Sequence, residues 1–589
     1  MIMFIVIMFF YFVILWLSKC SQIGWLLGAF LFVIFFAGFI SKGGKFAKLT
    51  GILKICPWIG LIVFLVIFTM ISQPPVKRVP AVSVKNPVET GVISVSEGDI
   101  SGVYNEDQTV EVYAGIPYAK PPVGELRWKE TQPAESWDGV LKCDEFGPMS
   151  MQSRSGTIYN SLVDLVIYKR LNFGFDDNYI EEMSEDSLYL NVWKPAGDVS
   201  GLPVVFFVHG GSLMTGQSSY GDYNGETFAK EGVIFVNFAY RLNIFGYMAE
   251  EGLAAESANG TTGNYGLLDQ IQALKWVKEN ISAFGGDPNN ITIAGESAGS
   301  SSVNALCVSP LTEGLFRRAI AESSGITAKK PYHTFRDLTD ALSMGKDIMF
   351  EFGVSDVTEL RNLSAEELLN TSYSNSAMTV DGYAITEQPY LTYEKGNNHE
   401  EALLNGYNAN EAEVFNYFVG KITPDNLSER LQTVLGDYTD EAIDLYKPKT
   451  NADAKAAFNS ILSAAWFEYS HHTWSDYMAD QEKPVYLYYF SKENSGLSNK
   501  HAGEMPYAYG NIDTSQLAFD ESDKELSDIM VTYWINFAKT GDPNGEGVPE
   551  WIDYKENRDQ LIEFNNEIQM INNPFNKMNE FLDSYQNGL

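Results

Sequence analysis

The sequence is poor in cysteine and histidine, with four and six among 589 residues. The cysteines at 20, 56, 143 and 307 lie far apart and lack any metal-ligand spacing. The sequence therefore predicts neither a zinc site nor a disulfide framework. Internal repeats and long low-complexity tracts are also missing, which argues against a repeat architecture or a disordered chain.

Acidic residues are missing from the N-terminal part of the chain, where Glu89 is the first carboxylate. The first 78 residues carry seven basic side chains, and the remainder carries 34 basic against 76 acidic residues, a net charge of −42. Nucleic acid and anionic lipid surfaces repel a body this acidic. We therefore expect no nucleic-acid partner, and the surface is interpreted as a solvated, soluble one.

Three uncharged apolar runs occupy the N-terminal region: Met1–Ser18, Ser21–Ile40 and Ile55–Gln73. A helix needs roughly 20 such residues to cross ~30 Å of hydrocarbon, and each run reaches or approaches that length. The first run lacks the basic start and the cleavage site of a signal peptide. We predict a membrane anchor of about three transmembrane helices over residues 1–73, followed by a proline-containing linker over 74–90.

Lysines between the second and third runs suggest an orientation: Lys42, Lys45, Lys48 and Lys54. Basic loops stay in the cytoplasm, so the third helix would exit outward. Lys77, Arg78 and Lys85 just beyond it favour the opposite orientation more weakly. We expect an integral protein of the cell membrane with its body on the extracellular side.

From about Gly91 the chain is predicted to form one α/β domain over residues 91–589. A hairpin is expected around 105–107, and apolar strand-like runs follow at Leu188–Trp193, Pro203–Val208, Val233–Phe238, Ile291–Ala294 and Val485–Phe490. Helical periodicity appears between them, as in Leu267–Ile281. Alternating strands and helices indicate a mostly parallel or mixed sheet covered on both faces.

A G-x-S-x-G peptide at 295–299 follows the β-branched run 290–294 and places Ser297 at a strand-to-helix turn. Small neighbours let the backbone reverse sharply there, so that the serine hydroxyl is exposed. Ester hydrolysis also needs a base, an acid that orients the base, and donors for the oxyanion. Serine hydrolases with this elbow place them in the order serine, acid, histidine.

That order favours His501, which lies in a turn-rich loop after the run Val485–Phe490. His209 precedes the serine, His333 and His399 lack an acid in a suitable position before them, and His471 and His472 lie in an apolar helical run. For the acid we favour Glu411, which follows the apolar Ala402–Leu404. Glu413, Asp381 and Asp444 remain alternatives.

The peptide His209-Gly210-Gly211-Ser212 follows the run Pro203–Val208 and can present backbone N–H groups to the site. With the amide of Ala298, which follows the serine, these N–H groups are candidate oxyanion donors. An ordinary tight turn explains a Gly-Gly pair equally well. A phosphate-binding loop is disfavoured because no Lys-Ser/Thr follows the glycines.

With these residues assembled, the body from about 91 to 575 resembles the type B carboxylesterase/cholinesterase family of α/β-hydrolases. The resemblance is carried by ordered motifs at 115–124 (GIPYAKPPVG), 126–128 (LRW), 185–193 (EDSLYLNVW), 264–270 (NYGLLDQ), 284–288 (FGGDP) and 540–544 (TGDPN), with Trp534 and Asn536-Phe537-Ala538 between the last two.

The resemblance implies the α/β-hydrolase fold and hydrolysis of a small-molecule carboxylic ester through an acyl-enzyme. It assigns Ser297 as the nucleophile, Glu411 as the acid and His501 as the base, with Gly211, Ser212 and Ala298 as the oxyanion hole. It implies no metal and no cofactor. Glu296, beside the serine, is typical of the family and would support the site electrostatically.

Three departures from the family pattern bear on specificity. Ser212 stands where the family usually has Gly or Ala, and Ser150 and Ser187 stand where two cysteines often close a loop over the active site. The segment Gln152–Met183 would then be a mobile lid without a disulfide. It contains no Trp, so a platform for quaternary ammonium is not evident and a general carboxylesterase is favoured.

The alternative comes from another class of protein. Some relatives of this fold are membrane-tethered adhesion proteins that have lost catalytic residues, and this chain is also predicted to be tethered. Because all three triad positions and the elbow are intact here, we favour the enzyme.

Overall fold

The computed structural model describes residues 2–39, 44–169, 179–330, 334–373, 376–416 and 419–588. These residues form two compact units. The first unit consists of Met1–Arg78, Arg154–Glu182 and Ser515–Ala518. The second consists of Val79–Ser153, Met183–Thr514 and Phe519–Leu589, and it contains the large sheet.

The sheet of the second unit has 13 strands in the order β19-β18-β17-β16-β13-β12-β10-β11-β9-β4-β3-β2, with β5 beside β3. Its central pairs, from β11 through β18, are parallel, whereas the pairs at both ends are mostly antiparallel. The strands are β2 (Glu89–Val95), β3 (Gly98–Tyr104), β4 (Val110–Pro117), β5 (Val140–Lys142), β9 (Tyr189–Pro195), β10 (Leu202–Val208), β11 (Ile234–Phe238), β12 (Gly286–Glu296), β13 (Arg318–Glu322), β16 (Leu403–Asn408), β17 (Val485–Phe490), β18 (Gln560–Phe564) and β19 (Gln569–Asn572).

Side-chain alternation along β10 shows why the sheet is buried on both faces. Val204, Phe206 and Val208 belong to one apolar core, and Val205 and Phe207 belong to the other. Successive side chains of a strand point to opposite faces, so a continuous apolar run fits a strand that is covered on both sides. The five predicted strand runs are confirmed, with ends shifted by a few residues.

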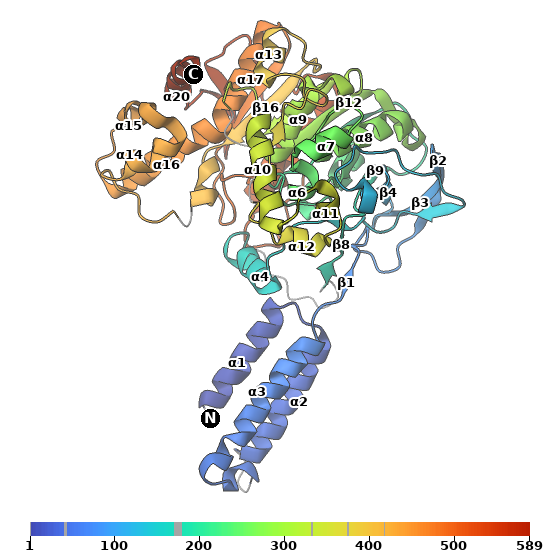
Figure 1. Cartoon of the computed structure of the whole chain (residues 1–589), viewed down its shortest axis with the longest axis vertical. Coiled ribbons are helices and arrows are strands. Elements are labelled where there is room, and N and C mark those ends of the chain that lie inside the picture. Colours follow the sequence, from blue (N-terminus) through green and yellow to red (C-terminus); the bar gives the residue numbers. More distant parts are fainter. Residues whose placement is uncertain are drawn as a thin grey trace. The chain divides into compact units, whose positions relative to one another are not determined.

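Helices cover the two faces of the sheet. On one face α8 (Tyr265–Asn280) and α9 (Ala298–Val308) pack through residues such as Leu274 and Val303, and on the other α19 (Glu521–Thr540) packs through residues such as Trp534. Figure 1 shows α8 and α9 beside β12 in the green part of the chain. The mixed, mostly parallel sheet covered on both faces is the predicted architecture.

Further helices complete the second unit. They are α5 (Glu226–Lys230), α6 (Asn243–Tyr247), α7 (Glu251–Glu256), α10 (Leu338–Phe352), α11 (Val357–Arg361), α12 (Ala365–Leu369), α13 (Pro389–Glu394), α14 (Leu427–Leu435), α15 (Thr439–Tyr446), α16 (Asn451–Ser463), α17 (Tyr469–Asp480), α18 (Met505–Ala508) and α20 (Asn576–Asn587). Short strand pairs join β6 (Met149–Ser150) to β8 (Met183–Ser184) and β14 (Phe335–Arg336) to β15 (Met378–Thr379).

The first unit is built on three apolar helices: α1 (Ile2–Leu17), α2 (Gln22–Phe39) and α3 (Cys56–Ile71). It also includes α4 (Thr157–Val166) and a two-stranded sheet of β1 (Val76–Lys77) and β7 (Ile180–Glu181). Most of the predicted lid therefore groups with the N-terminal helices.

The prediction of three transmembrane helices is not supported. Within the described ranges only the helical stretch Gly51–Ile71, with 21 residues, is long and apolar enough to cross a membrane. The stretches Ile2–Leu17 and Gln22–Gly38 are apolar but shorter. The 16 residues of α1 span about 24 Å at 1.5 Å per residue, which is less than the ~30 Å hydrocarbon core.

Candidate active site

Ser297 lies at a sharp turn between β12 and α9. Its backbone has φ 56° and ψ −127°, a strained conformation for a residue with a side chain. A Cβ at Gly295 would lie 2.6 Å from the Gly299 carbonyl, and one at Gly299 would overlap the Val208 carbonyl oxygen. The two glycines are therefore required by close backbone approach, which explains the G-x-S-x-G pattern.

Three side chains from separate parts of the sequence meet at this turn. His501 Nε2 lies 2.8 Å from Ser297 Oγ, and His501 Nδ1 lies 2.6 Å from Glu411 Oε2. The carboxylate accepts a hydrogen bond from Nδ1–H, which leaves the Nε2 lone pair for the serine hydroxyl. The structure thus brings together the three residues that the sequence predicted, with His501 between Glu411 and Ser297.

The acid loop and the histidine loop are tied to each other. Glu411 follows β16, is fully buried and accepts the Asn408 N–H at 2.7 Å. The Asn410 N–H donates to the Asn499 carbonyl at 3.0 Å, and the two side chains also bond at 2.8 Å. These bonds hold Glu411 opposite His501 because both residues lie within two positions of a bonded asparagine.

The other described histidines make bonds elsewhere. His209 Nδ1 bonds to the Gly210 carbonyl, His471 Nε2 accepts the Ser324 N–H, His399 Nε2 bonds to the Ser309 carbonyl, and His472 faces Asp476. His333 lies outside the described residues.

The alternative acids occupy other positions. Asp381 accepts the amides of Tyr383 and Ile385, and Asp444 lies in α15. Glu413 lies in the same turn as Glu411, which spans Glu411–Asn416. Of these two carboxylates, that of Glu411 is bonded to His501.

Charge around His501 favours its protonated form. Burial lowers the pKa of His501, but the carboxylates of Glu296 and Glu411 outweigh burial and raise it to about 9. Glu296 Oε1 lies 3.4 Å from His501 Nε2. Burial in turn raises the pKa of Glu296 to about 8, and the charge of His501 partly opposes that effect.

Two further buried carboxyls lie close to the turn. Glu504 accepts the hydroxyl of Ser323 at 2.9 Å and the amide of Asn408, and Glu322 accepts the hydroxyl of Tyr509 at 2.6 Å. Burial raises the pKa of Glu504 to about 7 and that of Glu322 well above its usual range. The sequence prediction did not include them, because nothing in the local pattern distinguishes them from surface acids.

The glycine loop lies against the nucleophile. A Cβ at Gly210 would lie 3.0 Å from Ser297 Cβ, and the loop turns through Gly211, Ser212 and Leu213 at φ 106°, 56° and 56°. Within the described parts of the chain, no group accepts the amides of Gly211, Ser212 or Ala298. Unpaired N–H groups beside the serine have the character of an oxyanion-binding site.

The loop is held by side chains that the sequence prediction missed. Gln152 bonds both backbone groups of Gly216: its Oε1 accepts the N–H at 2.9 Å and its Nε2 donates to the carbonyl at 2.8 Å. The Tyr240 hydroxyl donates to the His209 carbonyl at 2.8 Å. Because these contacts link residues far apart in sequence, no local signal could have identified them.

Aromatic side chains flank the histidine. Phe467 lies 4.7 Å from His501 and Phe415 lies 5.2 Å from it, between ring centroids. Phe415 follows Glu411 in the same turn and is 45% exposed. An exposed aromatic beside the base offers an apolar surface to the part of a substrate bound there.

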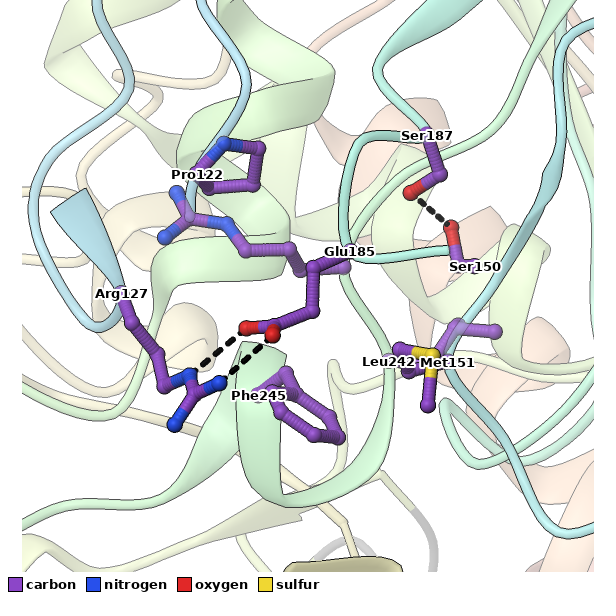
Figure 2. Close-up of a pocket in the computed structure, with 9 residues that line it drawn as sticks. Pro122, Arg127, Ser150, Met151, Glu185, Ser187, Leu242 and Phe245 are labelled. Atoms are coloured by element: carbon purple, nitrogen blue, oxygen red, sulfur yellow. Dashed lines mark hydrogen bonds and ion pairs between the residues drawn. The ribbon is translucent and has the colours of Figure 1, made fainter. Parts of the chain in front are cut away.

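The two serines at the usual cysteine positions face each other. Ser150 Oγ and Ser187 Oγ are 2.9 Å apart and both residues are buried, and Figure 2 shows this bond beside the ion pair of Arg127 and Glu185. The cavity here is about 10 Å³, which is room for about one water molecule. It therefore has no room for a substrate. The mobility predicted for the lid stays a prediction.

Metal-ligating side chains do not cluster within the described ranges, where no group of three or more His, Cys, Asp or Glu could hold an ion. All four cysteines are free. The side chains at the elbow instead form a chain from carboxylate to imidazole to hydroxyl, which suits acyl transfer to serine.

Comparison with known proteins gives concordant results. The carboxylesterase family model matches residues 89–582. Fumonisin B1 esterase of Sphingopyxis macrogoltabida is 32% identical over 495 residues, covering 80% of this chain and 86% of that protein. Neuroligin-3 of Mus musculus is 32% identical over 521 residues, covering 76% and 61%. The crystal structure of a Geobacillus stearothermophilus carboxylesterase is 33% identical with a TM-score of 0.72, covering 84% and 100%.

Proposed function

Because this chain belongs to the carboxylesterase family and is a serine carboxylesterase, we propose that it cleaves esters through an acyl-enzyme formed on Ser297. In this proposal His501 is the general base and Glu411 orients it. The observation that carries the proposal is the bonded series from Glu411 through His501 to Ser297, with contacts of 2.6 and 2.8 Å.

In the first step Ser297 Oγ attacks the ester carbonyl carbon while His501 Nε2 takes the hydroxyl proton. The carbonyl oxygen becomes an oxyanion and accepts hydrogen bonds from the amides of Gly211, Ser212 and Ala298. The tetrahedral intermediate collapses, the bond to the alcohol oxygen breaks, and His501 gives its proton to the departing alcohol. The acyl group then remains on Ser297.

In the second step water attacks the acyl carbon while His501 again takes the proton. Collapse of the second intermediate releases the carboxylic acid and returns the proton to Ser297 Oγ. Glu411 accepts the hydrogen bond from His501 Nδ1–H throughout and stabilises the imidazolium. Neither step needs a metal or an organic cofactor, because the base and the oxyanion donors are supplied by the chain.

Hydrolysis of a p-nitrophenyl ester series by the full-length protein in detergent tests this proposal. Release of p-nitrophenol with acetate or butyrate esters is the expected result, and the chain-length profile would describe the acyl site. Absence of hydrolysis from a folded protein would favour the alternative of a catalytically silent, membrane-tethered adhesion protein. The similarity to neuroligin-3 is the finding that keeps this alternative in view.

Gly211→Ala is expected to lower kcat by about 10²–10³ with little change in KM, because it misplaces oxyanion donors. Gly211 has φ 106°, and a Cβ there would overlap the Thr215 carbonyl. Gly221→Ala is the matched control, since a Cβ at Gly221 meets nothing within 4 Å. Steady-state kinetics on p-nitrophenyl acetate measures both. An equal loss in both variants, or none in either, would contradict the assigned role of the loop.

We also propose that residues 1–73 attach the protein to the cell membrane and that the hydrolase domain, 91–589, lies outside. Support comes from the 21-residue apolar stretch Gly51–Ile71, little of which is buried, and from Lys45, Lys48 and Lys54 before its apolar core. Protease treatment of intact cells should therefore cleave the body. A body that survives while control surface proteins are cut would reverse the orientation.

Membrane attachment is tested by alkaline extraction of membranes. The full chain should stay in the pellet, whereas the double variant Ile62→Asp, Val66→Asp should be released, because each central Asp costs roughly 2.5–3.5 kcal/mol in a transmembrane helix. Both side chains are about half exposed on α3. The double alanine variant at the same positions is the control and should stay membrane-bound. Release of the unmodified chain would disprove the attachment.

A further inference from the structure

The helix α4 exposes an apolar stripe. Ile158, Tyr159, Leu162 and Val166 are 42%, 57%, 42% and 60% exposed. At about 100° per residue these four positions lie within an arc of about 100° on one side of the helix. A soluble protein rarely leaves such a stripe in water, so its exposure indicates a binding face.

The position of α4 indicates what that face meets. Ser161 Oγ donates to the carbonyl of Leu17, the last residue of α1, at 2.8 Å. The Ser21 N–H, just before α2, donates to the carbonyl of Ser72, just after α3, at 2.8 Å. Figure 1 shows α4 at this end of the three blue helices. The stripe is therefore displayed where the apolar stretch Gly51–Ile71 ends.

The segment that contains α4 is held at this end from both sides. β7, after α4 in sequence, pairs in parallel with β1, which lies five residues beyond Ile71. Arg78 forms an ion pair with Glu182 at 3.3 Å, and Arg154 donates to the Glu181 carbonyl at 2.7 Å. These contacts all lie within the first unit, to which Arg154–Glu182 belongs together with the N-terminal helices.

We propose that α4 is an interfacial helix, whose apolar stripe lies in the surface of the membrane that holds Gly51–Ile71. An amphipathic helix that is bonded to the end of a membrane helix meets the lipid surface there. The inference rests on the membrane attachment and the esterase activity proposed above. The proposed partner of the stripe is lipid. Burial of the stripe against a second protein is the alternative that the experiment below can detect.

This position adds esters dissolved in the bilayer to the substrates that the enzyme would take. The segment leaves the second unit after Ser153, the neighbour of Gln152, and re-enters it at Met183. The side chain of Gln152 holds Gly216 of the glycine loop. A segment held at the lipid surface is thus joined covalently to a residue that positions the oxyanion loop. Esters with long apolar chains would meet the enzyme from the membrane, whereas short esters would reach it from water.

Fluorescence quenching tests the location of α4 without relying on activity. The full-length chain is placed in phosphatidylcholine nanodiscs with or without bromine atoms on the lipid chains. Tyr159→Trp should show more quenching by brominated lipid than the unmodified protein, because the new indole lies in the stripe. Asn160→Trp, one residue away and on the other side of the helix, should show no added quenching. Equal quenching of the two variants would overturn the proposal, as would added quenching in neither.

Kinetics tests the substrate class. Leu162→Glu should lower hydrolysis of p-nitrophenyl palmitate dissolved in the nanodiscs by about tenfold, since a charge in the stripe opposes interfacial binding. Hydrolysis of water-soluble p-nitrophenyl acetate should stay within about twofold. Asn160→Glu adds the same charge off the stripe and should change neither rate.

The outcomes separate the proposals. Equal losses on both esters would assign Leu162 a structural role and contradict the interfacial function. Unchanged rates on both esters in Leu162→Glu would show that the stripe plays no part in the hydrolysis of esters dissolved in lipid. If the unmodified protein cleaves neither ester, the proposed esterase activity fails, while the quenching result still decides where α4 lies. Quenching absent from nanodiscs together with a stable dimer in detergent would assign the stripe to a second copy of the chain.

Discussion

Ser297→Ala is expected to lower kcat/KM for p-nitrophenyl acetate by about 10⁶, which would leave a rate close to that of the oxyanion hole and binding alone. The reason is geometric: Ser297 Oγ is the hydroxyl 2.8 Å from the base, on a half-buried residue at a strained turn. No neighbouring hydroxyl has that contact with His501 among the described residues. Steady-state kinetics with active-site titration measures the loss.

An exposed serine supplies the control for this prediction. Ser355→Ala, in a surface turn before α11, should keep full activity, and both variants should melt within a few degrees of the unmodified protein. If Ser297→Ala keeps activity within about tenfold, a different residue is the nucleophile and the mechanism above is wrong.

Glu411→Gln is expected to lower kcat by about 10³–10⁴, because an amide in this place no longer fixes the imidazole tautomer. The carboxylate accepts His501 Nδ1 at 2.6 Å and is fully buried. Glu413→Gln removes the same charge from the same turn, two residues away, and should cost little. Comparable losses in the two variants would mean that charge near the turn matters and that orientation of His501 by Glu411 does not.

The pH profile of kcat/KM gives Glu411→Gln a second readout. His501 must be neutral to act as base, so activity rises as pH rises through its pKa. Neighbouring carboxylates, against the opposite effect of burial, raise that pKa to about 9 in the unmodified enzyme. Without the Glu411 charge the imidazolium is less stabilised and the pKa of His501 falls, so the acid limb of the profile should move to lower pH. An acid limb that stays at the same pH would show that Glu411 does not influence the pKa of His501.

Much of the fold and the site was predictable because it is encoded locally. The continuous apolar run Pro203–Val208 predicts β10, because it is bounded by turn residues and its length suits a strand buried on both faces. The elbow around Ser297 is readable because close backbone contact demands glycine at 295 and 299. Chain order and loop context favour His501 as the base. They also favour Glu411 as the acid but leave three alternatives open, and the family resemblance then assigns Glu411.

Other features depend on contacts between residues distant in sequence. The bonds of Gln152 to Gly216, the ring of Phe467 against His501, and the buried carboxyls Glu322 and Glu504 give no local signal. The grouping of Arg154–Glu182 with the N-terminal helices is of the same kind. The prediction of three membrane helices is not supported because composition does not show where a helix ends, and α1 stops after 16 residues.

The central claim, that Ser297 is an activated nucleophile, is tested most directly by covalent labelling with a fluorophosphonate followed by mass spectrometry. An activated serine displaces fluoride from phosphorus and keeps the phosphonyl group. The proposed mechanism predicts a single adduct on the peptide that contains Ser297, formed more slowly while excess ester substrate is present and absent from Ser297→Ala. An adduct on another residue, or none on a protein that hydrolyses esters, would contradict it.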